Sequence, residues 1–250
     1  MPPPPKFNVK RLPSVPQPPP PKIPEQQIIQ RFAANEDRMK EVYKTYTFAQ
    51  TARVEEFTKP GGEFIVTGQV YTRPDGKQLW RISGRPLSTL KMTSLTMEDV
   101  RTIATIPLFF LTTDQIANYN FLYAGEDKLD ELHTYVFQVK PKQLSRQRTF
   151  FEGVVWVDQQ DLTIVKSYGK FVTEVPGAGI RLPFKMFETY RQNFHGHDWL
   201  PTYTNSDDFI NEPDGSQVHL RLVVSDTDFK LQQPPPGTGN STPPAPGKPQ

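Results

Sequence analysis

Residues 151–168, with the sequence FEGVVWVDQQDLTIVKSY, contain the pattern that decides the fold. Two apolar runs, 151–157 and 162–168, lie on either side of the polar tetrapeptide 158–161. Short runs rich in β-branched and aromatic residues, separated by a polar turn, are typical of a β-hairpin. We therefore expect two antiparallel strands joined by a tight connection in this segment.

The same pattern recurs on both sides of this hairpin. Apolar and polar residues alternate in several more segments, and the connections between them are rich in Pro, Gly and Asp, as in Arg73-Pro74-Asp75-Gly76. Further strands are expected at 46–54, 64–70, 79–82, 119–123, 135–139, 184–193, 199–205 and 218–224. Short connections favour antiparallel pairing of successive strands, and about ten twisted strands tend to curl.

Two segments have helical character instead. Apolar residues between Ile28 and Tyr43 recur at intervals of three or four, which predicts an amphipathic helix that ends near Lys44. Thr96, followed by Glu98 and other acidic residues, resembles the start of a second helix that would end before Pro107. The predicted fold class is α+β, a curved antiparallel sheet or half-barrel of about ten strands with helices covering its concave face.

Proline marks the ends of the chain. Of the 27 prolines in 250 residues, eleven lie in 1–24 and seven in 233–250. Proline-rich segments favour extended polyproline II without a packed core, so we expect two disordered tails around one β domain at 25–232. The tails contain five Lys or Arg residues and no acid, so the domain carries a net charge of about −3 although the whole chain carries +2. This charge distribution argues against nucleic-acid binding.

Several functional classes receive no support from the sequence. Cysteine is absent, which excludes disulfides, thiolate metal sites and a cysteine nucleophile. No apolar run approaches the ~18–20 residues of a membrane-spanning helix. No signal peptide is recognisable after Met1, because prolines follow it in place of an apolar segment.

One cluster, His195-Gly196-His197-Asp198, contains residue types that bind metals. It lies where a hairpin turn is expected, and no third or fourth ligand is identifiable, so we interpret it as a turn. The Gly-x-Ser-x-Gly, Ser-x-x-Lys and His-Glu-x-x-His motifs are absent. The sequence therefore predicts a protein that is not an enzyme, with no catalytic residue, metal or cofactor.

Aromatic and large aliphatic residues are distributed over several strands, and two interpretations of them remain open. They form an ordinary core, or a curved sheet presents them around an apolar ligand cavity. The segment 108–111, Leu-Phe-Phe-Leu, is likewise either a core plug or a lid over that cavity. The candidate cavity residues are Phe48, Phe64, Val66, Trp80, Ile82, Leu108, Phe109, Phe110, Phe121, Tyr123, Phe137, Trp156 and Phe187.

The order of three strand motifs prompts a family resemblance. Tyr-x-Phe-x-Tyr-x-Gly at 119–125 is followed by Thr-Tyr-Val-Phe-x-Val-x-Pro-Lys at 134–142 and by Phe-x-Gly-x-x-Trp-Val-Asp-x-x-Asp-x-x-Ile-Val at 151–165. Together with the helix and the strand that begins at Tyr46, these motifs resemble the outer-membrane lipoprotein-sorting (LolA/LolB-like) superfamily, in particular its uncharacterised bacterial members. The resemblance extends over most of residues 27–230.

This resemblance implies an incomplete β-barrel with helices as a lid, which binds the acyl chains of lipids or lipoproteins in the bacterial periplasm. The family's strand arginine that latches the lid would correspond to Arg53 or Arg81. The expected function is a non-enzymatic carrier or binder of lipids or lipidated proteins, with peripheral contact to a membrane. The alternative is an envelope protein-interaction or sensor module of the same fold, with the proline-rich tails as tethers to envelope proteins.

Overall fold

A computed structural model describes residues 18–96, 99, 103, 106–174, 184–211 and 215–232 of the chain. The described elements are, in order, α1 (Glu25–Tyr43), β1 (Tyr46–Glu56), β2 (Glu63–Thr72), β3 (Gln78–Ile82), β4 (Leu87–Ser88), the 3₁₀ turn η1 (Ile116–Asn118), β5 (Tyr119–Leu129), β6 (Leu132–Pro141), β7 (Phe150–Asp158), β8 (Ile164–Val172), β9 (Phe187–Phe194), β10 (Asp198–Asn211) and β11 (Gln217–Leu231).

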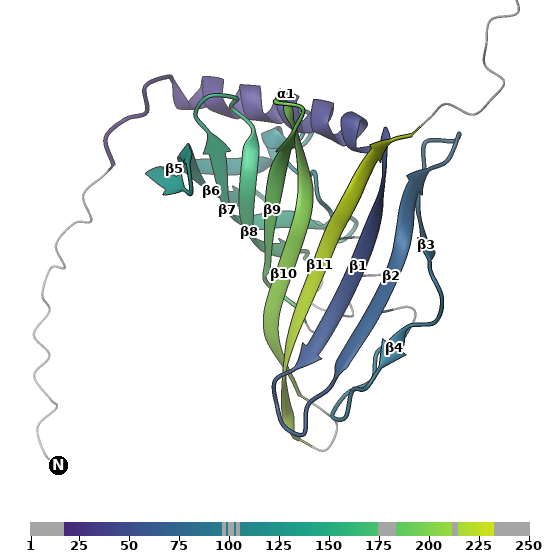
Figure 1. Ribbon diagram of the computed structural model, residues 1–250. Coiled ribbons are helices and arrows are strands. Elements are labelled where there is room, and N and C mark those ends of the chain that lie inside the picture. The colour runs from purple at the N-terminus through teal and green to yellow at the C-terminus, as the bar shows by residue number, and fades with distance from the viewer. Residues whose placement is uncertain are drawn as a thin grey trace, which may run out of the picture.

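The strands form one sheet in the order β3-β2-β1-β11-β10-β9-β8-β7-β6-β5, and β4 pairs with β2. Every pairing is antiparallel, and β11 joins the N-terminal meander β1–β3 to the second meander β5–β10. Because β3 and β5 lie at the two ends of this order, the sheet is open. Helix α1 lies across one end of it, and the long strands β1, β2, β10 and β11 run away from the helix (Figure 1).

The predicted fold class is confirmed: one curved antiparallel sheet combined with helix. The hairpins expected around 158–161 and 195–198 are present, and the helix expected from Ile28 to Lys44 spans Glu25–Tyr43. Most of the second expected helix lies outside the described residues. Its start is visible, because Thr96 and Asp99 exchange the two hydrogen bonds of a capping box. Both proline-rich tails lie largely outside the described residues.

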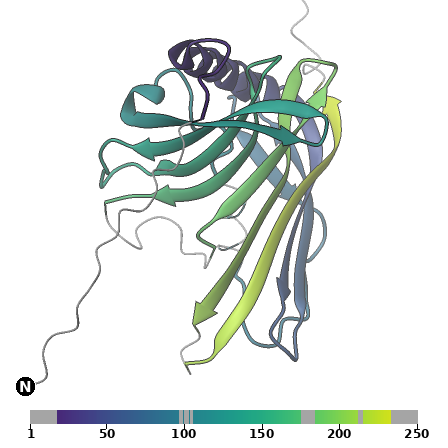
Figure 2. The same ribbon diagram turned by 90° about the vertical axis from the view of Figure 1, so that its left-hand side faces the viewer.

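Curvature has a local cause in the register of the strands. The pairing shifts at four places, between Thr47 and Ala49, Tyr123 and Gly125, Trp156 and Val157, and Pro201 and Tyr203. A β-bulge increases the local twist and bends its strand. In Figure 2 the teal strands β5–β8 are accordingly steeply inclined to the long green and yellow strands β10 and β11.

One of these bulges accommodates a proline inside the sheet. Pro201 of β10 pairs with Arg191 of β9, whereas the pairing of β10 with β11 begins only at Tyr203. Proline cannot donate a ladder hydrogen bond, and at this position β10 has a partner strand on one side only. The register shift with β9 follows directly, so Pro201 lies at an irregular point of the ladder.

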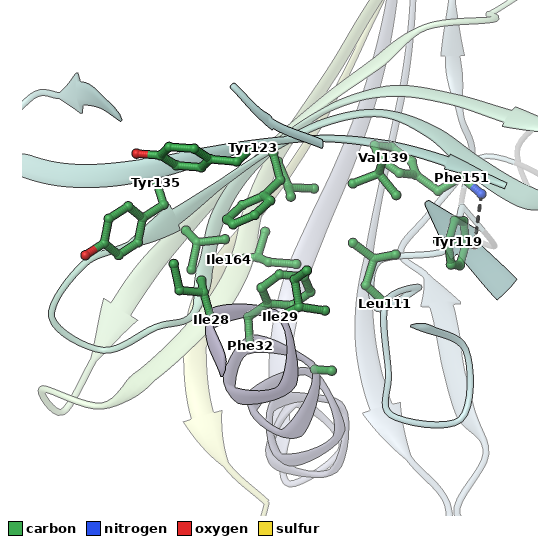
Figure 3. Close-up of a cluster of buried hydrophobic side chains, with 14 of the residues drawn as sticks. Ile28, Ile29, Phe32, Leu111, Tyr119, Tyr123, Tyr135, Val139, Phe151 and Ile164 are labelled. Carbon is green, nitrogen blue, oxygen red and sulfur yellow. Dashed lines mark hydrogen bonds between the residues drawn. The ribbon is translucent and has the colours of Figure 1, made fainter. Parts of the chain in front are cut away.

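The core beneath the first half of α1 is closely packed. Ile28 and Phe32 of the helix are fully buried against Phe137 and Ile164 of the sheet. Figure 3 shows these helix side chains pointing into a layer of strand residues, together with the hydrogen bond that the backbone N–H of Phe151 donates to the hydroxyl of Tyr119 over 3.2 Å. Among the described residues, these side chains fill the space between the first half of α1 and strands β6 and β8.

A buried carboxylate organises the chain that follows β4. Glu56 is 7% exposed, and its two oxygens accept the backbone N–H groups of Lys91, Met92 and Thr93 at 2.8–2.9 Å. Three N–H groups that would otherwise lack partners are thereby satisfied. This contact holds residues 91–93 against the end of β1.

Replacing Glu56 with alanine is expected to lower the free energy of unfolding by ~2–3 kcal/mol, because the three N–H groups lose a charged acceptor. Urea denaturation measures the loss, and hydrogen exchange at residues 91–93 should accelerate. Glu55→Ala is the matched control, since the neighbouring Glu55 points to the other face and forms an exposed ion pair with Arg53. Equal losses in the two variants would contradict the organising role of Glu56.

Candidate ligand-binding cavity

The second half of the helix covers a hollow that side chains leave unfilled. A cavity of about 750 Å³ lies between the C-terminal end of α1, strands β1–β3 and the segment 106–109. This volume is within the range of small-molecule sites. Its lining consists of Lys40, Tyr43, Lys44, Phe48, Gln50, Val70, Gln78, Leu79, Trp80, Ile82, Ile106, Leu108 and Phe109.

The wall of the cavity is mainly apolar because of strand alternation. Phe48 is fully buried on β1, and its cross-strand neighbour Val70 on β2 is 7% exposed. Trp80 pairs with Val70 from β3, so these three side chains project from adjacent strands on one face. Leu108 and Phe109 add two further apolar side chains to the lining. A hydrocarbon chain among these side chains would be removed from water.

A buried ion pair holds both elements that enclose the cavity. The guanidinium of Arg191, on β9, makes a bidentate pair with Glu36 of α1, and its Nη2 lies 3.1 Å from Oε2. The same Nη2 donates to the carbonyl oxygen of Leu108 at 3.0 Å, and the guanidinium lies 4.9 Å from the ring centroid of Phe109. The two side chains are 3% and 0% exposed. One arginine therefore fixes the helix and the segment 108–109 to the sheet.

Arg191 occupies the role that the sequence suggested for Arg53 or Arg81. Arg53 lies on the outer face of β1 and pairs with Glu55 and Glu63, with its side chain 48% exposed. Arg81 is also exposed. Neither is among the described contacts of the helix, so the correspondence suggested for them was wrong and the latch comes from β9.

A second polar group, the carboxyl group of Asp226, lies beside the cavity. Its interactions offset the cost of its burial less completely than the ion pair offsets that of Arg191 and Glu36. Asp226 of β11 accepts hydrogen bonds from the Tyr43 hydroxyl at 3.1 Å and from Gln50 Nε2 at 3.0 Å, and both donors line the cavity. Burial raises the pKa of Asp226 to about 7, although these two hydrogen bonds act to lower it. Asp226 therefore holds a proton up to neutral pH, unlike an exposed carboxyl group.

Trp80 lines the cavity and also packs against a neighbouring buried cluster, which contains Val54, Phe64 and Val66. Its indole lies against Gly68 of β2, where an added Cβ would be 2.5 Å from the indole nitrogen and from the carbonyl oxygen of Arg81. The absence of a side chain at Gly68 thus allows the close approach. The indole N–H is buried and has no hydrogen-bond partner among the described residues.

The structure brings together five of the thirteen residues expected around a cavity. Phe48, Trp80, Ile82, Leu108 and Phe109 line it. The other eight lie elsewhere. One buried cluster contains Phe64, Val66 and Phe187. The cluster beneath the first half of α1 contains Tyr123 and Phe137, and Phe110 and Phe121 pack against it.

Trp156 lies apart from these two clusters and packs, partly buried, against a third one that contains Val165 and Trp199. Its indole N–H donates to Asp127 at 3.0 Å, and Lys166 lies 4.7 Å from its ring centroid. Its inward-facing strand neighbours Val155 and Val157 are fully buried. Trp156 therefore belongs to the opposite face of β7.

Sequence reasoning missed several lining residues, and some had a visible signal. Val70 continues the alternation of Phe64 and Val66, and Gln50 follows Phe48 at the same interval of two. Lys40 and Lys44 lie one helical turn apart, but nothing in the sequence indicates that the helix passes over the first strands. Their position at a cavity is a tertiary property.

A larger hollow, of about 860 Å³, lies between the tip of the β5–β6 hairpin and β9. Its lining includes Lys128, Asp130, Glu131 and Arg191. Charged groups of both signs make it a poor environment for an apolar ligand. The cavity at the end of α1 is therefore the better candidate.

The His195-Gly196-His197 sequence forms the turn between β9 and β10, with φ of 54° at His195 and 81° at Gly196. Among the described residues, no group of three or more His, Cys, Asp or Glu residues is arranged to hold a metal ion. Within the same residues, no helix combines the length and the hydropathy that crossing a membrane requires.

No protein-family model and no curated protein sequence matches the chain. Among solved structures, it is similar to a DUF1329 family protein from Desulfovibrio piger, with 14% identity, a TM-score of 0.38, and coverage of 82% of this chain and 92% of that one. It is also similar to a LolA superfamily protein from Nitrosomonas europaea, with 13% identity, a TM-score of 0.37, and coverage of 82% and 95%.

A third similar structure is a proposed outer membrane lipoprotein-sorting protein domain from Vibrio parahaemolyticus, with 9% identity, a TM-score of 0.39, and coverage of 80% and 92%. Two of these three descriptions name the superfamily that the strand motifs resemble.

Proposed function

We propose that this protein is a non-enzymatic carrier that binds the acyl chain of a lipid or lipidated protein in the cavity at the end of α1. The observation that carries the proposal is a mainly apolar hollow of about 750 Å³ that is open on one side and is lined by the end of α1, strands β1–β3 and the segment 106–109. Transfer of hydrocarbon from water contributes ~0.8 kcal/mol per methylene group. A chain of ten methylenes would therefore gain roughly 8 kcal/mol before the costs of association are subtracted.

The enclosure suits loading and release. Both covering elements are attached to the sheet through Arg191, whereas the first half of α1 is anchored by its own apolar core. Movement of the segment 108–109 would open the cavity without unpacking that core. The bacterial periplasm is the compartment that the family resemblance implies, and it forms part of the proposal.

A cavity-filling variant tests the proposal. Val70→Trp places an indole in the hollow and is expected to weaken binding of a fluorescent fatty acid by about tenfold or more, equivalent to ~1.4 kcal/mol. Gln69→Trp is the matched control, because Gln69 is the preceding residue of β2 and is exposed on the other face. Fluorescence titration measures the affinities, and the thermal midpoint shows that each variant is folded.

Native mass spectrometry of the unmodified protein gives a second readout, in which copurified lipid is expected. A protein that is free of lipid and does not bind the fatty acid would contradict the proposal. Equal binding by the Val70→Trp and Gln69→Trp variants would move the site away from this cavity.

A further inference from the structure

The rim of the cavity differs in charge from its wall. Lys40 and Lys44 line the cavity from the last turns of α1, and they are its two charged lining residues. Side chains four residues apart lie on the same face of a helix, so both ammonium groups are at one side of the opening. Lys40 is exposed, and the side chain of Lys44 is 33% exposed. An apolar hollow therefore has a cationic edge.

Neither lysine is fully neutralised by the protein. Lys44 pairs with Glu41 at 2.6 Å, but the Glu41 side chain is 69% exposed, and such exposed pairs exchange readily with other partners. For Lys40, no salt bridge is found among the described residues. Its charge contributes to lowering the pKa of Asp114, but hydrogen bonds from Thr112 and Gln115 lower that pKa more. Both cations remain available to an anion at the rim.

The helix C-terminus itself carries partial negative charge, which would oppose an anion. Here the carbonyl groups of the last three helical residues, Glu41, Val42 and Tyr43, accept hydrogen bonds. The backbone N–H groups of Lys44 and Thr45 donate to Glu41 and Val42, the Thr45 hydroxyl donates to Val42, and Gln78 Nε2 donates to the carbonyl of Tyr43 at 3.5 Å. These hydrogen bonds reduce the opposing field next to the two lysines.

Resting on the proposed function, we propose that the preferred ligand is an amphiphile with an anionic head group, whose single hydrocarbon chain enters the cavity while its carboxylate or phosphate lies between Lys40 and Lys44. The wall supplies affinity, since it removes hydrocarbon from water. The two lysines supply selection among amphiphiles with equal chains.

Matched dodecyl compounds test this selection by isothermal titration calorimetry of the full chain, each below its critical micelle concentration. Dodecanoate and dodecyl phosphate are expected to bind about fivefold more tightly than dodecyltrimethylammonium, the size of effect that exposed ion pairs produce. Comparison of the two anions distinguishes a carboxylate head group from a phosphate. The difference between anion and cation should shrink at high salt, because salt screens exposed charges.

The variant Lys40→Gln/Lys44→Gln should bind the three compounds within about twofold of one another. Lys140→Gln/Lys170→Gln changes the net charge equally on β6 and β8 and should keep the anion preference. If all three compounds bind alike and the first variant changes nothing, the head-group inference is wrong and the carrier proposal stands. If no dodecyl compound binds, both are wrong.

Discussion

Replacing Arg191 with alanine is expected to lower the free energy of unfolding by ~3–5 kcal/mol, the typical cost of breaking a buried ion pair by removing one partner. The variant leaves the Glu36 carboxylate, 0% exposed, without its cation. It also removes the donor to the Leu108 carbonyl and the cation above the Phe109 ring. The loss should therefore appear both in global stability and in the order of the segment 108–109.

Urea denaturation at neutral pH measures the change, and Arg53→Ala is the matched control. Arg53 pairs with Glu55 and Glu63 on the exposed face, so its removal should cost at most ~1 kcal/mol. A double variant, Glu36→Leu/Arg191→Met, should recover much of the lost stability, because it leaves no unpaired charge. An Arg191→Ala variant as stable as Arg53→Ala would contradict the buried latch.

Replacing Asp226 with asparagine is expected to stabilise the protein above neutral pH and to leave its stability nearly unchanged below about pH 4. The pKa of Asp226 is about 7 in the folded chain, compared with 3.8 for an unperturbed aspartate. Between these values the unfolded chain releases the proton and the folded chain retains it. Ionisation therefore favours unfolding, and stability falls as the pH rises through this window.

The full cost corresponds to roughly 4 kcal/mol, at ~1.4 kcal/mol for each pH unit between the two values. Asparagine keeps an acceptor for Gln50 and can donate an amide N–H to the Tyr43 hydroxyl oxygen, so a hydrogen bond to each neighbour remains, with its direction at Tyr43 reversed. Unfolding free energies of both proteins between pH 4 and pH 8 measure the effect as a difference, in which other titrating groups cancel.

Asp207→Asn provides a control of opposite sign. Burial acts to raise the pKa of Asp207, but hydrogen bonds from His219 and Arg221 outweigh it and lower that pKa below the usual value. This carboxylate therefore stabilises the folded chain above its unfolded pKa, and the contribution is lost as the pH falls through the folded pKa. A stability difference between Asp226→Asn and the unmodified protein that does not change with pH would rule out a raised pKa at Asp226.

Strand and helix identity followed from local periodicity. The alternation Phe48-Gln50-Ala52-Val54 predicts both β1 and its inward face, and the spacing of Ile28, Phe32, Met39 and Tyr43 predicts α1 and its buried side. Element lengths were less well predicted. β5 continues to Leu129 and β6 begins already at Leu132, because cross-strand pairing continues through a polar segment that has no apolar alternation.

The candidate site was only partly predictable for a related reason. Phe48 and Phe137 have the same period and the same burial, yet the first lines the cavity and the second fills the core beneath α1. Periodicity indicates which face a side chain occupies. It contains no information on whether the opposing element approaches closely enough to fill the space.

The sequence by itself determined the elements, the antiparallel pairing of neighbours and the apolar face of the sheet, because each depends on residues close together in the chain. The tertiary structure decided where that face stays unfilled, since α1, strands β1–β3 and the segment 106–109 meet there from distant parts of the sequence. Glu36 and Arg191 are 155 residues apart, and no local pattern links them. Asp226 likewise acquires its raised pKa only when folding buries it, because the hydrogen bonds from Tyr43 and Gln50 act in the opposite direction.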